Sequence, residues 1–277
     1  MKEMLGKAYA GGYGVGGFNA FDSLSMMALI EECKAKKSPI LMICASAEYA
    51  TYGPRGVAEI AKAMSGLMGV DVCLHLDHGD SYDVVVDAIT GGFSSVMIDG
   101  SRLPFAENIA ETRRVVEYAH AKGIHVEAEL GAVGRVDNTT HEGAHGNSFT
   151  DPDQAAEFVD KTGCDFLAVS IGNAHGLYTA APEFDFDTLA RIRKAVPIPL
   201  VLHGGSGTPE DQLKKAVSMG MAKVNVASEI GRAFTTKYIE SAVDHKTWWA
   251  VAKNEAKGAM REVIGRWIGM LGTEGKA

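Results

Sequence analysis

The segment Val72-Cys73-Leu74-His75-Leu76-Asp77-His78 joins the apolar run of a buried strand to a strongly polar end. His175 and His203 stand in a similar setting, because each lies after a short apolar stretch and directly before a glycine. Such runs are typical of strands in a parallel sheet that is covered on both faces. The three segments therefore predict parallel strands that present histidines at their carboxyl ends.

Outward from these segments, strand-like and helix-like patterns alternate along the chain. The predicted strands are Val15–Ala20, Pro39–Cys44, Asp71–Asp77, Ser94–Asp99, His125–Leu130, Phe166–Ile171, Pro199–His203 and Lys223–Ala227. The predicted helices are Leu24–Lys37, Val57–Met68, Ser81–Thr90, Phe105–Lys122, Asp153–Thr162, Phe186–Ala195, Pro209–Met219, Glu229–Glu240 and Asp244–Met270.

Eight strands, each followed by a helix, predict an α/β fold, a (β/α)8 TIM barrel with additional C-terminal helices. We expect one domain over residues 1–277, with a helical extension at about 241–277. A doubly wound open sheet is the alternative, but no GxGxxG motif follows a strand, as dinucleotide-binding sheets of that type require.

The composition and charge of the chain limit the kinds of partner that it can bind. Hydrophobic residues make up 46% of the chain and charged residues 22%, which is typical of a globular protein with a large core. The net charge of −8 gives no basic surface for nucleic acid. The four cysteines form no CxxC pair, and neither a signal-peptide core nor a membrane-length apolar run is present. We expect a cytoplasmic protein with no nucleic-acid or membrane partner.

Because active groups of barrels gather at the carboxyl ends of the strands, His78, His175 and His203 are predicted to converge there on one divalent metal. Three protein ligands with one open position is the catalytic arrangement of zinc, the default metal for imidazole ligands without redox groups. Asp77 then supplies an acid/base. Asp99 and Glu129 end two further strands, where they would orient the ligands, offer a second metal position or form salt bridges.

Two glycine-bearing or polar segments complete the predicted site. Gly204-Gly205-Ser206-Gly207 and Asn225-Val226-Ala227-Ser228 follow the last two strands, where barrels commonly bind phosphate through backbone N–H groups.

The polar segment from Ala132 to Thr150 is much longer than an ordinary connection, so we expect either a lid over the site or a surface excursion.

At these residues the chain resembles the class II, metal-dependent ketose-bisphosphate aldolases, similar to fructose- and tagatose-bisphosphate aldolases. The resemblance covers about residues 5 to 240. The matching motifs are Gly17-Phe18-Asn19, Ser38-Pro39, His75-Leu76-Asp77-His78, Val96-Met97-Ile98-Asp99-Gly100-Ser101, Val126-Glu127-Ala128-Glu129-Leu130-Gly131, Ile171-Gly172-Asn173-Ala174-His175-Gly176-Leu177-Tyr178, Leu200-Val201-Leu202-His203-Gly204-Gly205-Ser206-Gly207 and Lys223-Val224-Asn225-Val226-Ala227-Ser228-Glu229.

The resemblance implies reversible cleavage of a phosphoketose to dihydroxyacetone phosphate and an aldehyde such as glyceraldehyde 3-phosphate. It implies one Zn²⁺ per subunit, a monovalent cation (Na⁺ or K⁺) near the phosphate, and a homodimer or homotetramer. Asp77 would take the C4 hydroxyl proton, and Asp137, with Glu142 in reserve, would be the mobile-loop acid. The zinc ligands would be His78, His175 and His203, and the substrate and phosphate contacts Asn19, Gly176, Gly204, Ser206, Asn225 and Ser228.

Three positions depart from the family pattern. Ala227 stands where fructose-bisphosphate enzymes tend to have Asp, which is closer to the tagatose-bisphosphate pattern. Ala45 stands at a serine that meets the distal phosphate, and Gly231 at a basic residue; Ser46 and Arg232 are adjacent. A ketose 1-phosphate or another substituted sugar phosphate is therefore an alternative substrate.

Three other functions compete with this one. A Schiff-base aldolase needs a lysine at the catalytic end of the barrel, and Lys223 opens the last predicted strand, at the opposite end. An amidohydrolase-type barrel needs an HxH pair on the first strand, which this chain lacks. A non-catalytic barrel that binds phosphosugars remains a rival from another class.

Overall fold

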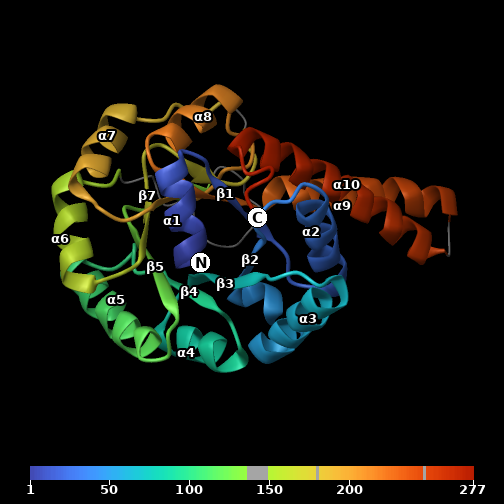
Figure 1. Cartoon of the computed structure of the whole chain (residues 1–277), viewed down its shortest axis with the longest axis horizontal. Helices are drawn as coiled ribbons and strands as arrows, with labels where there is room; N and C mark the ends of the chain where they lie inside the picture. The colour runs from blue at the N-terminus through green and yellow to red at the C-terminus, as the bar shows by residue number, and fades with distance from the viewer. Residues whose placement is uncertain (136–148, 179–180, 246–247) are drawn as a thin grey trace.

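The structure, a computed structural model, describes residues 1–135, 149–178, 181–245 and 248–277. Eight parallel strands close into a barrel in the order β1-β10-β9-β7-β5-β4-β3-β2 (Figure 1). This confirms the predicted (β/α)8 barrel. The strands are β1 Val15–Asn19, β2 Leu41–Ala45, β3 Cys73–Gly79, β4 Ser95–Ile98, β5 His125–Leu130, β7 Phe166–Val169, β9 Leu200–Leu202 and β10 Met221–Val226.

A ring of helices surrounds the strands (Figure 1). Their amphipathic faces pack on the outer faces of the strands in one continuous apolar cluster, which is why the strands read as apolar runs. The ring helices are α2 Ser23–Ala35, α3 Gly53–Met68, α4 Tyr82–Gly91, α5 Phe105–His120, α6 Pro152–Thr162, α7 Phe186–Ala195 and α8 Glu210–Ser218, and the others are α1 Lys2–Gly11, α9 Ser228–His245 and α10 Trp249–Leu271.

The sequence sets the helix ends by ordinary capping. In α6 the Asp151 side chain accepts hydrogen bonds from the backbone N–H groups of Asp153 and Gln154, Pro152 occupies the first turn, and Gly163 ends the helix in a left-handed conformation. Such signals explain why α6 and α7 were predicted to within one residue of their observed bounds.

Helix α1 was not predicted from the sequence, and it closes the amino-terminal end of the barrel. Leu5 and Ala8 are fully buried there, in a cluster with Val15, Cys73 and Phe166 from the first residues of three strands. The polar spacing of residues 2 to 11 hid this helix, because its few apolar side chains serve only to plug the barrel floor.

The last two helices form a hairpin that projects beyond the ring (Figure 1). Residues of α10 pack against α9, α2 and α8. Ile264 and Trp267 are 1% exposed, whereas Trp248 and Trp249, where α10 begins, are 71% and 59% exposed. None of the helices in the described part of the chain is long and apolar enough to cross a membrane.

A short two-stranded sheet lies outside the barrel order. Its strands are β6, Gly134–Arg135, and β8, Ala174–His175, which pair in parallel. The segment predicted as a lid therefore starts beside His175. Its residues 136–148, which include Asp137 and Glu142, lie outside the described residues.

Candidate metal centre

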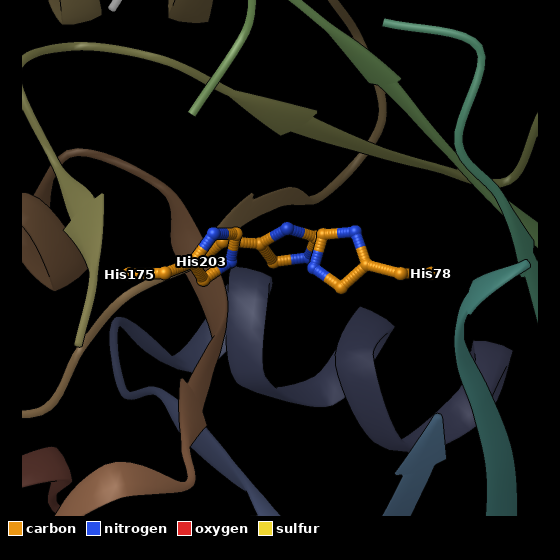
Figure 2. Close-up of side chains that lie close together, drawn as sticks. All are labelled: His78, His175 and His203. Atoms are coloured by element: carbon orange, nitrogen blue, oxygen red, sulfur yellow. The ribbon is translucent and has the colours of Figure 1, made fainter. Parts of the chain in front are cut away.

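Three imidazoles converge at the carboxyl ends of the strands, as Figure 2 shows. His78 lies on β3, His175 on β8 and His203 directly after β9. One ring nitrogen from each lies within 4.8 Å of the other two. These atoms share a centre within about 3 Å, so a small contraction gives the Zn–N distance of about 2.0–2.1 Å. The sequence prediction that these residues meet is confirmed.

A bulge in β3 is what brings His78 into this group. Between Leu76 and Gly79 the strand has one residue more than its neighbour β4, and His78 adopts a φ of +47°. In a regular strand Asp77 and His78 would point to opposite sides. The extra residue re-aims the side chain, so that Asp77, the predicted acid/base, and His78, the predicted ligand, both reach the site from adjacent positions. A non-glycine residue at positive φ is itself uncommon and costs conformational energy.

Asp99 holds His78 by one of its ring nitrogens. The Nδ1 atom of His78 lies 2.8 Å from Oδ2 of Asp99, which leaves Nε2 buried and without a hydrogen-bond partner. Burial opposes charge on the imidazole, but the charge of Asp77 and the bond to Asp99 outweigh it and raise the pKa of His78. Asp99 is thus placed to orient the imidazole of His78, and its role behind a metal ligand stays a prediction.

In His203 a carboxylate binds Nε2, whereas in His78 it binds Nδ1. Its Nε2 atom donates to Oε1 of Glu127 at 2.9 Å, while Nδ1 lies 2.9 Å from Oε2 of Glu129 without the alignment of a hydrogen bond. Burial opposes charge on this imidazole, but the hydrogen bond to Glu127 and the nearby carboxylate of Glu129 outweigh it and raise the pKa of His203 to about 10. Asp99 and Glu129, the two residues predicted to orient the ligands or offer a second metal position, also lie within 4.8 Å of His78 and of each other.

A buried ion pair supports His203 from inside the barrel. Lys223 lies 2.7 Å from Oε2 of Glu127, and both side chains are fully buried. The expectation that Lys223 opens its strand at the far end was wrong, because β10 begins at Met221 and the ammonium reaches the carboxylate behind His203. His75 completes this network as the predicted core residue, with Nδ1 3.0 Å from the hydroxyl of Ser95.

Asp77 lies beside the imidazoles and is 8% exposed. The Nδ2 group of Asn225 donates to its Oδ1 atom at 2.8 Å. Burial opposes ionisation, but the neighbouring histidines and Lys223 outweigh it and lower the pKa of Asp77. Asn225 was predicted as a substrate contact, and its Oδ1 atom is buried without a partner.

The glycine-bearing loop after β9 is folded as only glycine allows. Gly204 has a φ of +65°, and a Cβ there would lie 2.0 Å from the carbonyl oxygen of Ala174. Tyr178 fixes the same contact, because its hydroxyl donates to the carbonyl of Gly204 and accepts from the N–H of Ala174. Ser206 and Gly176 lie in these turns, and Ser228 is the first residue of α9.

Several supporting residues were missed from the sequence. Asn173 is fully buried and donates from Nδ2 to the carbonyl of His203, which fixes the turn before His175. Glu127 and Lys223 carried a readable signal, since each is a charged residue on the inward side of an apolar strand. Such residues are almost never fully buried unless they are paired.

The comparisons with known proteins agree with this geometry. The model of the family described as fructose-bisphosphate aldolase class-II matches residues 1–276. The crystal structure of the YdjI aldolase from Escherichia coli K12 superposes with a TM-score of 0.88 at 34% identity, over 100% of this chain and 98% of that one. The fructose-bisphosphate aldolase of Campylobacter jejuni shares the fold, with a TM-score of 0.81 at 24% identity over 99% and 95% of the two chains.

Members of this family are generally metal-dependent, and the donor set described above fits a metal. The buried atoms Nε2 of His78 and Nδ1 of His203 have no hydrogen-bond partner, and the opposite nitrogen of each ring is held by a carboxylate. That is the usual arrangement around a metal-binding imidazole. The chain belongs to the class II fructose-bisphosphate aldolase family and is an aldolase, a carbon–carbon lyase.

Proposed function

We propose that this aldolase is zinc-dependent and reversibly cleaves a phosphoketose to dihydroxyacetone phosphate and an aldehyde such as glyceraldehyde 3-phosphate. The observation that carries the proposal is the convergence of His78, His175 and His203 beside the carboxylate of Asp77. Imidazoles held by carboxylates, with no thiolate among them, favour zinc.

Asp77 would act as the base of the cleavage. Breaking the C3–C4 bond requires that the C4 hydroxyl loses its proton, and the lowered pKa keeps Asp77 ionised and able to accept it. Asn225 fixes the orientation of that carboxylate through its 2.8 Å hydrogen bond. The zinc, when bound, would supply the Lewis acid that stabilises negative charge on the carbonyl next to C3.

The turns after β9 and β10 would hold the phosphate of the dihydroxyacetone phosphate half. Gly176 and Gly204 allow close approach to backbone N–H groups, and Ser206 and Ser228 add hydroxyls. Ser228 also begins α9, and the amino terminus of a helix this long favours an anion. Three further expectations stay predictions: a substrate contact by Asn19, a bound monovalent cation, and Asp137 as the loop acid.

Assays with and without a chelator test the proposal. The zinc-loaded protein is expected to cleave at least one of four substrates: the 1,6-bisphosphates and the 1-phosphates of fructose and tagatose. A chelator should abolish cleavage and added Zn²⁺ should restore it. Cleavage that survives complete removal of the metal contradicts the proposal. Tight phosphosugar binding without any turnover would instead favour the rival, a non-catalytic binding barrel.

A homodimer or homotetramer remains our expectation for the assembly. The exposed apolar residues Ile239, Val243, Trp248 and Trp249 on the projecting hairpin support it, since monomers rarely expose such side chains together. Light scattering of the purified protein measures the mass directly. A cytoplasmic location is likewise a proposal, in keeping with four buried free thiols.

A further inference from the structure

Glu48 is a carboxylate at the barrel mouth that the proposed reaction does not use. It lies on η1, the short helix Ser46–Tyr49 that follows β2 directly. Its Oε2 atom accepts a hydrogen bond from the backbone N–H of Ala45 at 2.8 Å and another from Nδ2 of Asn19 at 2.9 Å. The side chain is therefore folded back over the ends of β1 and β2, held by two neutral donors, and it stays partly exposed.

Glu48 lies on the same side of the mouth as Asp77. Ala45, whose N–H Glu48 binds, is in register with Asp77 on the neighbouring strand. Burial and, to a smaller extent, the negative charge of Asp77 outweigh the two hydrogen bonds and raise the pKa of Glu48. The two carboxylates thus interact electrostatically and make this arc of the mouth negative.

The phosphate-binding turns lie elsewhere, after β9 and β10. A substrate anchored there by its phosphate presents its C4 hydroxyl to Asp77. The atoms beyond C4, which become the aldehyde, would then begin at Asp77 and extend toward the end of β2, because Ala45 at that end is in register with Asp77. Glu48 therefore faces the aldehyde half of the substrate.

A second phosphate at this place would meet two unfavourable conditions. It would bring a double negative charge close to Glu48 and Asp77, in a partly buried setting where like charges repel strongly. It would also find the N–H of Ala45 and the amide of Asn19 already occupied by Glu48. Sugar hydroxyls have neither problem, because they donate hydrogen bonds to a carboxylate.

We propose that Glu48 is a specificity-determining residue, and that the natural substrate is a ketose 1-phosphate whose aldehyde half is an uncharged polyhydroxylated chain. This inference rests on the proposed function and narrows it. It predicts that the wild-type enzyme uses ketose 1-phosphates better than the matching 1,6-bisphosphates.

Glu48→Gln tests the charge alone. Both hydrogen bonds end on one oxygen, so the amide oxygen of glutamine can accept both while the negative charge disappears. The ratio of kcat/KM for fructose and tagatose 1-phosphates over their bisphosphates should fall by at least about tenfold in this variant. Glu107→Gln is the control, since it removes the same charge from an exposed position in the first turn of α5, and it should leave the ratio unchanged.

Binding of hexitol 1-phosphate and hexitol 1,6-bisphosphate gives a readout without turnover, because neither compound has a carbonyl to cleave. Calorimetry on the zinc-loaded protein should show tighter binding of the monophosphate, and Glu48→Gln should reduce this preference by about tenfold. A wild-type preference for the bisphosphate, or a preference unchanged in Glu48→Gln, overturns the inference. Absent cleavage of all four sugars alongside a Glu48-dependent binding preference would overturn only the proposed function.

Discussion

The two ends of the barrel treat buried polar groups in opposite ways. At the floor, the carboxylate of Asp165 accepts from Lys2, from Nε2 of His120 and from the backbone N–H of Val126, all at 2.8–2.9 Å. At the mouth, several buried polar atoms of the described residues have no hydrogen-bond partner, among them Nε2 of His78 and Oδ1 of Asn225, while Nδ1 of His203 and Oε2 of Glu129 face each other at 2.9 Å without hydrogen-bond alignment.

The difference shows which end of the barrel contains groups that lower the stability of the fold. An unpaired buried polar atom costs about 1–3 kcal/mol, so several of them in one place indicate a site that a bound ion, ligand or water completes. A φ of +47° at His78 adds strain at the same end. At the floor, by contrast, the carboxylate of Asp165 is fully paired and α1 plugs the barrel. Substitutions at the mouth should therefore change chemistry, and substitutions at the floor should change stability.

Loss of the Asp77 carboxylate should give the largest effect. Asp77→Ala is expected to lower kcat by about 10²–10⁴-fold, the usual contribution of a general base. Zinc content, measured by metal analysis after dialysis, should stay at one per subunit because the imidazoles remain. Asp80→Asn, an exposed change three residues further along the chain, is the control and should keep wild-type activity. Loss of zinc together with activity in Asp77→Ala would mean that Asp77 belongs to the ligand set.

The buried pair behind His203 is expected to act on the metal rather than on the reaction. Glu127→Gln removes the charge that faces Nε2 of His203 and should weaken zinc binding by about 10–100-fold, as loss of a carboxylate behind a metal-binding imidazole typically does. Competition with a chromogenic chelator measures this affinity.

The single variant also strands the ammonium of Lys223 in the interior, which costs about 3–5 kcal/mol of stability. The double variant Glu127→Gln/Lys223→Met separates the two effects. It should regain most of the lost unfolding free energy while zinc stays weakly bound. Recovery of both properties together would show that Glu127 serves only the fold.

Much of the mouth could be predicted from the sequence because its local signals are strong. Histidines that precede Gly176 and Gly204 mark tight turns after apolar strands, and the eight-strand pattern places such turns at one end. The direction in which the His78 side chain points could not be derived in the same way. Strict alternation directs His75 and Asp77 into the barrel and His78 out of it, and only the bulge in β3 resolves the conflict.

The floor was harder to predict for a different reason. Helix α1 buries little apolar surface, so its pattern is weak, and its docking depends on partners far along the chain, such as Asp165 for Lys2. Pairs separated by 163 residues leave no local signal. Glu48 lies between these two extremes. Its bond to Ala45 is local in sequence and therefore predictable, but its bond to Asn19 depends on how β1 and β2 are placed in the closed barrel.

Asp165→Asn should test the floor, with the smallest effect on activity. Burial raises the pKa of Asp165, but the N–H of Val126, His120 and Lys2 outweigh it and lower the pKa overall. A lowered carboxyl pKa contributes stability that is complete above the unfolded value of about 3.9 and is lost as the pH falls through the folded value. The substitution should therefore cost about 1–3 kcal/mol at pH 7, from urea unfolding, and less below pH 4.

Zinc affinity and the kcat of the folded fraction should both stay within about twofold of wild type, since Asp165 lies at the opposite end from the imidazoles. Asp160→Asn, an exposed change on α6 nearby, should alter neither stability nor its pH dependence. A large loss of kcat in Asp165→Asn at full folding would mean that the floor is coupled to the mouth. The network of His75, Glu127 and Lys223 inside the barrel would then be the first place to look for such coupling.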